Sequence, residues 1–416
     1  MPLSERRERM RNLLVAQSGG PTAAINATLA GVFQGAIGSD KVDHIYGAVN
    51  GIQGVLEEHF VDLRELLSNT QDQELLSQTP AAALGSCRVK LKDPAKDPSD
   101  YEKIISVFRK HEIHYFIYIG GNDSMDTVDK LSAYVRAQGI EDIQVVGAPK
   151  TIDNDLMGTD HCPGFGSAAK YIATTFSELE RDCHVYNVKA VTIVEVMGRN
   201  AGWLTAASAL SRLNGGEGPA LIYLCETAFD TEQFLKDVQE QLKVRDSVLV
   251  AVSEGVKDAQ GRYLSEQTQS GAVDNFGHSY IAGAAGILEQ LIRDRIGCKV
   301  RSIELNLMQR SAAHIASATD IRESQMLGRK ACQCALDGKS GRMASIRRIS
   351  DEPYRIELTD VPVSDSANAE KTVPREWINP KGNDVMPELI AYLKPLIQGE
   401  SQVIYQNGIP CHIRLY

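Results

Sequence analysis

The stretch YFIYIGGNDSMDT, residues 115–127, runs from a short apolar segment through two glycines into a polar segment. The run YFIYI is typical of a buried strand, and the two glycines predict a tight turn into a helix that starts near Asp123. Bare backbone amides at such a turn can approach a phosphate closely, because the first amides of a helix favour an anion. Asp123 places a carboxylate at the same turn, so the stretch raises the question of which anion the turn accepts.

The order of strand, turn and helix recurs along most of the chain. Helices are predicted to begin near Thr22 and near Asn200, and further apolar runs occupy residues 12–17, 143–149, 190–197, 219–226 and 247–254. Strands that read as continuous apolar runs, each followed by a helix, indicate parallel sheets with both faces covered. Six or more such units in about 300 residues predict an α/β fold of two doubly wound lobes with a cleft between them.

The sequence changes character after about residue 340. MASIRRIS (residues 343–350) and YRIELTD (residues 354–360) predict two antiparallel strands. Residues 361–377, which contain prolines and serines, predict a linker. We therefore expect a C-terminal α+β extension beyond the two lobes.

The composition narrows the class of protein. With 416 residues, of which 43% are hydrophobic, the chain is large enough for more than one core. The net charge of −10 argues against nucleic acid and anionic membrane as partners, and no apolar run reaches the roughly 18 residues that span a bilayer. The charged start, MPLSERRERMRN, lacks the apolar segment of a signal peptide, and the eight cysteines are scattered. We expect a soluble cytoplasmic protein with reduced thiols.

Chemically informative residues follow the predicted strands, at the edge where open parallel sheets bind ligands. Gly19-Gly20 after the first strand is either a phosphate-binding turn or a plain tight turn, and it lacks the lysine of a P-loop. In PKTIDND, residues 149–155, Asp153 and Asp155 stand two apart in an extended segment and point to the same side. One carboxylate could take a proton while the other holds a cation; an Asx-rich helix cap is the alternative.

Four more charged residues lie at strand ends or in a glycine-bearing loop: Arg88, Arg199, Glu254 and Arg310. Arg301 lies nine residues before Arg310. The arginines can each bind a phosphate through two guanidinium nitrogens, and the glutamate can accept hydrogen bonds from sugar hydroxyls. Taken alone, each is also explained as an exposed charge. The histidines show no metal-ligand spacing, so we expect them to be structural or exposed.

Taken together and in this order, the motifs resemble those of the phosphofructokinase family. The resemblance runs from about residue 12 to about residue 335 and rests on SGG, GSCR, IGGNDS, PKTIDND, EVMGR, SEG, DNFGH and MQR. It implies an enzyme that phosphorylates the C1 hydroxyl of fructose 6-phosphate with Mg²⁺, as a homo-oligomer (a dimer or a tetramer). It also implies a donor-binding lobe at residues 1–160, a sugar-phosphate-binding lobe at residues 161–310, and a return to the first lobe with the extension at residues 311–416.

The resemblance implies roles for the motif residues. Asp153 is expected to be the base that takes the proton of the C1 hydroxyl, and Glu254 is expected to bind the sugar. Arg301 and Arg310 are expected to bind the 6-phosphate, one of them from a neighbouring subunit, and Arg88 is expected to touch the moving phosphoryl group. The other implied substrate contacts are Gly20, Thr151, Met197, Gly198 and Arg199.

Two positions answer the question raised by the opening stretch. ATP-using members of the family carry glycine at the positions of Asp123 and Lys150, whereas both are filled in the pyrophosphate-using branch, which this chain resembles. A carboxylate at 123 would crowd and repel the α-phosphate of a nucleotide, and the ammonium of Lys150 adds the positive charge that a short donor needs. Pro21 also fits this branch. The resemblance therefore implies inorganic pyrophosphate as the donor in a reversible reaction, with Asp123 and Lys150 in the catalytic centre.

Three departures from the family pattern affect the site. Asn122 replaces a magnesium-binding aspartate, so we expect Asn122 and Asp155 to share the metal. Ala190 replaces an arginine and leaves Lys189 as the adjacent candidate for the 6-phosphate. Leu307 replaces a histidine or tyrosine, which would relax the preference for one sugar. The alternatives are an ATP-dependent kinase of the same fold and a catalytically silent regulatory subunit.

Overall fold

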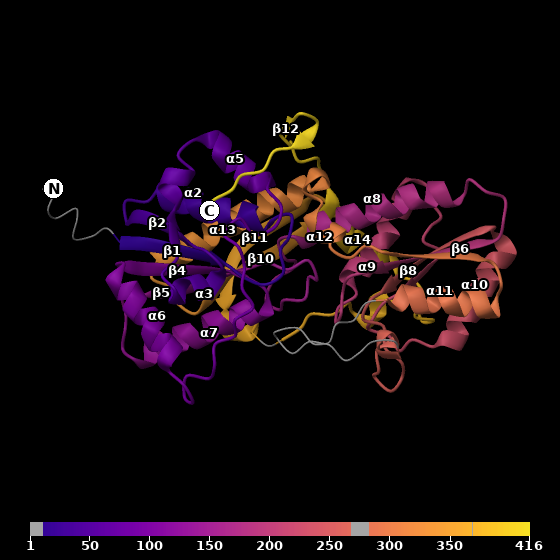
Figure 1. Ribbon diagram of the computed structural model, residues 1–416, viewed down its shortest axis with the longest axis horizontal. Helices are drawn as coiled ribbons and strands as arrows, with labels where there is room; N and C mark the ends of the chain where they lie inside the picture. The colour runs from indigo at the N-terminus through magenta and orange to yellow at the C-terminus, as the bar shows by residue number, and fades with distance from the viewer. Residues whose placement is uncertain (1–10, 268–282, 368) are drawn as a thin grey trace, which may run out of the picture.

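The computed structural model describes residues 11–267, 283–367 and 369–416, and its two lobes lie side by side along the long axis of the molecule (Figure 1). The motif DNFGH, residues 274–278, lies outside the described residues. Within the described ranges, no helix is long and apolar enough to cross a membrane. Each lobe contains one mainly parallel sheet with helices on both faces, which confirms the predicted α/β fold.

The first lobe is built on a seven-stranded sheet in the order β11-β10-β5-β4-β1-β2-β3. Its central strands are parallel: β1 (Arg11–Gln17), β2 (Val42–Ala48), β4 (Ile113–Gly120) and β5 (Gln144–Pro149). The short edge strand β3 (Phe60–Asp62) runs antiparallel to β2. The apolar runs at residues 12–17 and 115–119 therefore form neighbouring central strands, as their sequences predict.

Alternate residues of β1 enter two different cores, because successive side chains of a strand point to opposite faces. Leu13 and Val15 pack with residues of α2 (Ile25–Ile37) and α13 (Ala318–Leu336). Leu14 and Ala16 pack with residues of α6 (Ser99–Lys110) and α7 (Asn122–Ala137). Shorter helices complete the lobe: α3 (Gly51–Leu56), α4 (Leu63–Leu66) and α5 (Thr70–Gln78).

The second lobe has a four-stranded parallel sheet in the order β7-β8-β6-β9. Its strands are β6 (Ala190–Val196), β7 (Leu221–Tyr223), β8 (Ser247–Ser253) and β9 (Lys299–Glu304). One core lies between this sheet and α8 (Phe165–Cys183) with α9 (Trp203–Ala207), and the other lies under α10 (Thr231–Val244) and α11 (Ala284–Arg295). The apolar strands are thus buried on both sides.

The C-terminal part of the chain contacts both lobes. The strands β10 (Arg342–Asp351) and β11 (Tyr354–Pro362) pair antiparallel on the edge of the first sheet, which confirms that prediction. The helix α14 (Pro387–Leu393) packs into the core of the second lobe through Leu389 and Leu393, and Leu415 returns to the first lobe. The domain ranges that the resemblance implies stay predictions.

The start of α2 differs from the sequence-based expectation. The helix begins at Ile25 rather than near Thr22, because the hydroxyl of Thr22 accepts a hydrogen bond from the backbone amide of Ile25 at 2.9 Å. Thr22 thus supports the helix start from outside the helix, as hydroxyl side chains commonly do. The helix α7 begins at Asn122, next to the expected position.

Candidate active site

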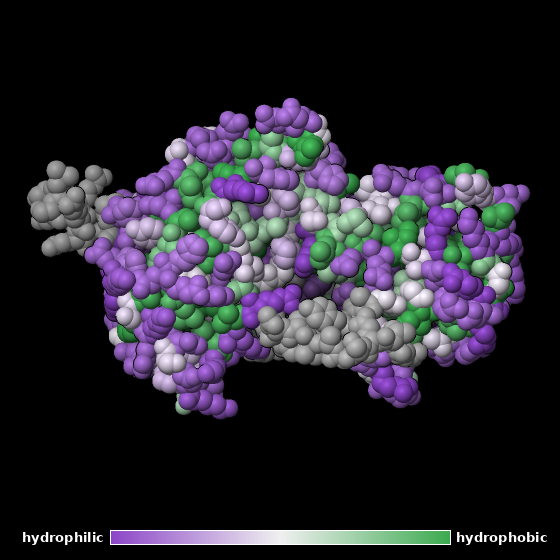
Figure 2. Space-filling view, in the orientation of Figure 1, coloured by the Kyte–Doolittle hydropathy of each residue, from purple (hydrophilic) through white to green (hydrophobic). Residues whose placement is uncertain are grey.

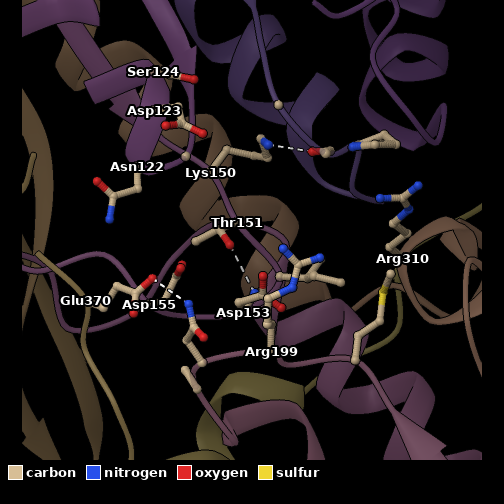
Figure 3. A pocket seen from close by; sticks show the side chains of 18 of the residues that line it. Asn122, Asp123, Ser124, Lys150, Thr151, Asp153, Asp155, Arg199, Arg310 and Glu370 are labelled. Carbon is tan, nitrogen blue, oxygen red and sulfur yellow. Dashed lines mark hydrogen bonds between the residues drawn. The ribbon is translucent and has the colours of Figure 1, made fainter. Parts of the chain in front are cut away.

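A cavity of about 610 Å³ lies between the two lobes. Figure 2 shows the surface hollowed there, and Figure 3 shows the side chains that line the cavity. The lining comes mainly from residues just beyond the carboxyl ends of β1, β4, β5, β6 and β8. This is the edge at which open parallel sheets bind ligands. The structure therefore brings most of the predicted site residues together: Gly20, Arg88, Asn122, Asp123, Lys150, Thr151, Asp153, Asp155, Met197, Arg199, Glu254 and Arg310.

Lys150 lies at the meeting point of the two glycine turns. Its side chain is 2% exposed, and Nζ donates a hydrogen bond to the carbonyl oxygen of Gly20. Gly19 has a φ of 78°, a conformation that favours glycine, and the hydroxyl of Ser86 donates to its carbonyl at 2.7 Å. Burial lowers the pKa of Lys150 to about 8, although Asp153 and Asp155 oppose the shift. A buried ammonium whose pKa stays low despite two nearby carboxylates is a strong site for an anionic ligand.

The first turn of α7 carries both the amide and the carboxylate of the opening stretch. Asp123 is 37% exposed and lies 3.2 Å from Nζ of Lys90, so its charge is partly offset. Asn122 donates through Nδ2 to the carbonyl oxygen of Ala369 at 3.1 Å. Both side chains line the cavity at the N-terminus of a 16-residue helix.

Asp153 and Asp155 line the cavity (Figure 3), and the residue between them in the sequence, Asn154, is buried. Asn154 has a φ of 55°, and its Oδ1 accepts from the amide of Cys162 at 3.0 Å. The hydroxyl of Thr151 accepts from the amide of Asp153 at 3.1 Å. These contacts hold the loop so that both carboxylates face the same space.

Burial raises the pKa of both aspartates, and the like charge of Asp155 adds to the shift at Asp153. Lys150 is the first cation that opposes the shift at Asp153. Oδ1 of Asp155 is buried and has no hydrogen-bond partner among the described residues. In the same ranges, no three His, Cys, Asp or Glu side chains lie close enough together to hold a metal ion by themselves. A divalent cation here would need oxygen atoms from the ligand as well.

The second lobe supplies the opposite wall. Glu254 accepts from the amide of Gly198 at 3.3 Å, and burial together with Asp153 raises its pKa to about 8. Gly198 has a φ of 134°, and a Cβ there would lie 2.4 Å from the carbonyl oxygen of Ala201, so the turn requires glycine. The turn places Met197 and Arg199 in the lining of the cavity.

Arg310 enters the cavity from α12 (Met308–Ser311). A Cβ built on Gly20 would lie 3.3 Å from its NH1 atom, so the guanidinium reaches the glycine turn after β1. Burial and the neighbouring Arg88 both lower the pKa of Arg310. Two adjacent guanidinium groups favour a shared anion such as a phosphate.

Arg301 does not reach this cavity within the chain. It lies within β9, opposite Thr192 of β6, in a separate small pocket, and its NH1 atom is 3.9 Å from Asp182. Lys189 also points elsewhere: its Nζ donates to the carbonyl oxygens of Leu242 and Arg245. Neither residue binds a ligand of the cavity unless that ligand belongs to another copy of the chain.

Glu370 and Asn200 line the cavity and were not predicted from the sequence. Asn200 donates through Nδ2 to Glu370 at 2.9 Å. Asn200 follows the EVMGR motif, so its position one residue beyond Arg199 is the signal that could have found it. Glu370 follows no strand or glycine turn, and no local pattern marks it.

The chain is similar to known proteins over nearly its whole length. The Phosphofructokinase family model matches residues 12–335. A pyrophosphate–fructose 6-phosphate 1-phosphotransferase of Methylococcus capsulatus is 40% identical over 408 residues, which cover 97% of this chain and 96% of the relative. The protein of the same name from Halomonas elongata is 41% identical over 406 residues, or 96% of this chain and 94% of the relative. The crystal structure of a pyrophosphate-dependent phosphofructokinase from Nitrosospira multiformis aligns with a TM-score of 0.87 at 37% identity and covers 97% of this chain and 96% of that one. The chain thus belongs to the phosphofructokinase family.

Proposed function

We propose that the protein reversibly transfers a phosphoryl group from inorganic pyrophosphate to the C1 hydroxyl of fructose 6-phosphate, giving fructose 1,6-bisphosphate and phosphate. The observation that carries the proposal is the buried ammonium of Lys150. A Cβ built on Gly19 would lie 3.4 Å from this ammonium and 4.0 Å from the amide nitrogen of Gly121, so two phosphate-binding turns meet at one positive charge. The relatives named for this reaction are 40% and 41% identical over nearly the whole chain.

A diphosphate is short enough to lie between these turns, whereas a nucleotide must extend further. Asp123 stands at the start of α7, where a longer donor would have to pass. Because Lys90 offsets part of its charge, and an exposed ion pair of this kind is weak, Asp123 would exclude nucleotides by bulk as well as by charge. Position 150 is a lysine and not a glycine, so its side chain fills space that a nucleotide would otherwise use.

Asp153 is the group that accepts the proton of the C1 hydroxyl. Its raised pKa makes it a stronger base than an exposed aspartate, and it still loses its proton readily beside Lys150. Glu254 and Arg199, on the opposite wall, would hold the sugar hydroxyls and position C1 near Asp153.

The positive side chains offset the charge of the phosphoryl group as it moves. Lys150 and Arg88 would bind the donor, and Arg310 would bind the 6-phosphate next to it. Because the donor turns and the sugar wall belong to different lobes, the positions of the two substrates depend on how the lobes are held together.

The residues present fit a Mg²⁺ ion bound between protein and donor. Asn122 and Asp155 would hold it, and the buried Oδ1 of Asp155 that lacks a hydrogen-bond partner among the described residues is the observation that supports this assignment. When bound, the ion neutralises charge on the phosphate oxygens.

We also propose that the enzyme works in the cytoplasm as a homo-oligomer. Arg301 lies in a pocket outside the cavity of its own chain, so it would bind a 6-phosphate only in the site of a neighbouring copy. Residues 1–160 would then bind the donor and residues 161–310 the sugar phosphate.

The test uses the purified wild-type protein alone with Mg²⁺. Fructose 6-phosphate is offered with either pyrophosphate or ATP, and products are identified by phosphorus NMR. We expect fructose 1,6-bisphosphate and phosphate from pyrophosphate, and pyrophosphate from the reverse reaction. Turnover with ATP only would contradict the donor assignment, and no turnover with either donor would contradict the enzyme assignment.

A further inference from the structure

The C-terminal part of the chain delivers a carboxylate to the cavity. Residues 369–373, here called the strap, lie across the cleft between the two lobes. On the side of the first lobe, the amide of Lys371 donates to the carbonyl oxygen of Asp155 at 2.7 Å, and Ala369 accepts from Nδ2 of Asn122 at 3.1 Å. Hydrogen bonds therefore join the strap to Asn122 and Asp155, the two residues that would hold the metal ion.

The strap is fixed equally to the second lobe. The indole nitrogen of Trp203 donates to the carbonyl oxygen of Lys371 at 2.9 Å, and the amide of Val373 donates to Glu226 at 2.9 Å. Contacts from both lobes determine the backbone on either side of Glu370. The position of its side chain is thus set by the fold and not by a mobile surface loop.

Glu370 and Asp155 lie next to each other at one end of the cavity, and Arg310 lies at the other (Figure 3). The backbone of Glu370 forms a β-bridge with Leu156, directly after Asp155. Two carboxylates at close range destabilise each other unless a cation lies between them.

The neighbouring Lys371 does not fill that place. Its ammonium turns toward the interior, where it donates to the carbonyl oxygen of Asp160 at 2.7 Å and to that of Thr159 at 3.2 Å. Glu370 is exposed to the cavity and accepts from the neutral amide of Asn200. Both carboxylates line the cavity, so a cation that enters with the donor can be held between them.

We propose that Glu370 is the second carboxylate that binds the divalent cation accompanying the donor, together with Asp155. The side-chain amide of Asn122 has no negative charge, and its Nδ2 donates a hydrogen bond to the strap. Glu370 of the strap therefore supplies the negative charge that Asn122 lacks. Two carboxylates plus phosphate oxygens are a usual ligand set for Mg²⁺. The inference rests on the proposed function, because the phosphate oxygens come from pyrophosphate.

The test measures metal binding without turnover. Mn²⁺ replaces Mg²⁺, methylenediphosphonate replaces pyrophosphate, and the free Mn²⁺ signal in electron paramagnetic resonance gives the Kd. Glu370→Gln removes the charge but keeps an oxygen that can accept from Asn200, so a purely structural role would survive it. We expect the Kd for Mn²⁺ to rise at least about tenfold in Glu370→Gln.

Two further variants sharpen the result. Glu370→Asp keeps the negative charge, but the shorter side chain places the carboxylate further from the cation. The Kd of this variant for Mn²⁺ should therefore lie between those of the wild type and Glu370→Gln. Glu376→Gln, an exposed change in the same C-terminal part of the chain, should leave the Kd unchanged. Thermal unfolding confirms that each variant is folded.

An unchanged Kd for Mn²⁺ in Glu370→Gln would overturn the role of Glu370 while leaving the proposed function intact. Failure of the wild type to bind Mn²⁺ with the diphosphonate would contradict the proposed function and this inference together. The two failures are therefore distinguishable.

Discussion

Replacing Lys150 with methionine should weaken pyrophosphate binding and at the same time stabilise the ligand-free protein at neutral pH. Lys150 is 2% exposed, and burial lowers its pKa to about 8. A lysine in an unfolded chain has a pKa of roughly 10.4, and the difference corresponds to about 3 kcal/mol. Asp153 and Asp155 offset part of the cost of burying the ammonium, and an anionic ligand would offset the remainder.

The sign of the effect follows from proton binding. The unfolded chain binds the proton of Lys150 more tightly, so the free energy of unfolding should be lower below about pH 8 and should rise toward roughly pH 10.4. The Lys150→Met variant lacks this contribution to the pH dependence of the free energy of unfolding. Because the carbonyl oxygen of Gly20 loses its partner, worth about 1 kcal/mol, the net gain in stability at pH 7 should be about 1–2 kcal/mol.

Calorimetry at pH 7 without ligand measures the stability, and steady-state kinetics measure the KM for pyrophosphate. A lost charge-assisted contact of roughly 1.5–3 kcal/mol should raise that KM about 10- to 150-fold. Lys170→Met is the matched control: Lys170 is also buried but donates to Gly399 and Glu400 outside the cavity, so its loss should lower stability and leave the KM unchanged. An unchanged KM in Lys150→Met would remove Lys150 from the donor site, and lower stability would show that its hydrogen bond outweighs the cost of burial.

Three further predictions concern the proposed chemistry. Asp153→Asn should lower kcat at least ~10²-fold in a folded protein, and the wild-type kcat/KM should fall with decreasing pH at a pKa well above 4, because the raised pKa leaves Asp153 protonated there; near-normal turnover in the variant would remove Asp153 as the base. Arg310→Ala should raise the KM for the sugar phosphate about 10- to 150-fold; a larger effect on the KM for pyrophosphate would assign Arg310 to the donor, whose turn it also approaches. Mixing inactive Arg301→Ala with inactive Asp153→Asn subunits should restore activity if Arg301 acts in a neighbouring copy, and no recovery after subunit exchange would contradict that arrangement.

The parts of the site that follow strands could be predicted from the sequence. Gly19, Asp123, Asp153 and Glu254 all stand just beyond the carboxyl end of an apolar run, and parallel strands in one sheet end at one edge. The fold class could be predicted for the same reason, since apolar runs followed by helices have few other arrangements. The position of a residue relative to the end of its strand therefore carried most of the information.

The parts that depend on contacts between distant segments could not be predicted. Glu370 enters the cavity because Asn122, Trp203 and Glu226 hold the strap, and none of these contacts leaves a local pattern in residues 369–373. Arg301 shows the opposite case: the resemblance implies that it binds the 6-phosphate, but it lies within β9, away from the edge that forms the cavity. Tertiary contacts decide both positions.

The central claim is that Lys150 and Asp123 make the cavity a site for pyrophosphate and not for nucleotides. The most direct measurement is kcat/KM for pyrophosphate and for ATP, at saturating fructose 6-phosphate and fixed Mg²⁺, in the wild type, Asp123→Gly, Lys150→Gly and the double variant. Asp123→Gly should give the first detectable use of ATP, Lys150→Gly should chiefly damage the pyrophosphate reaction, and the double variant should shift the ratio furthest toward ATP, without strict additivity. If Asp123→Gly leaves ATP unused and the pyrophosphate reaction unaffected, the claim is wrong, and Asp123 is only a residue at the start of a helix.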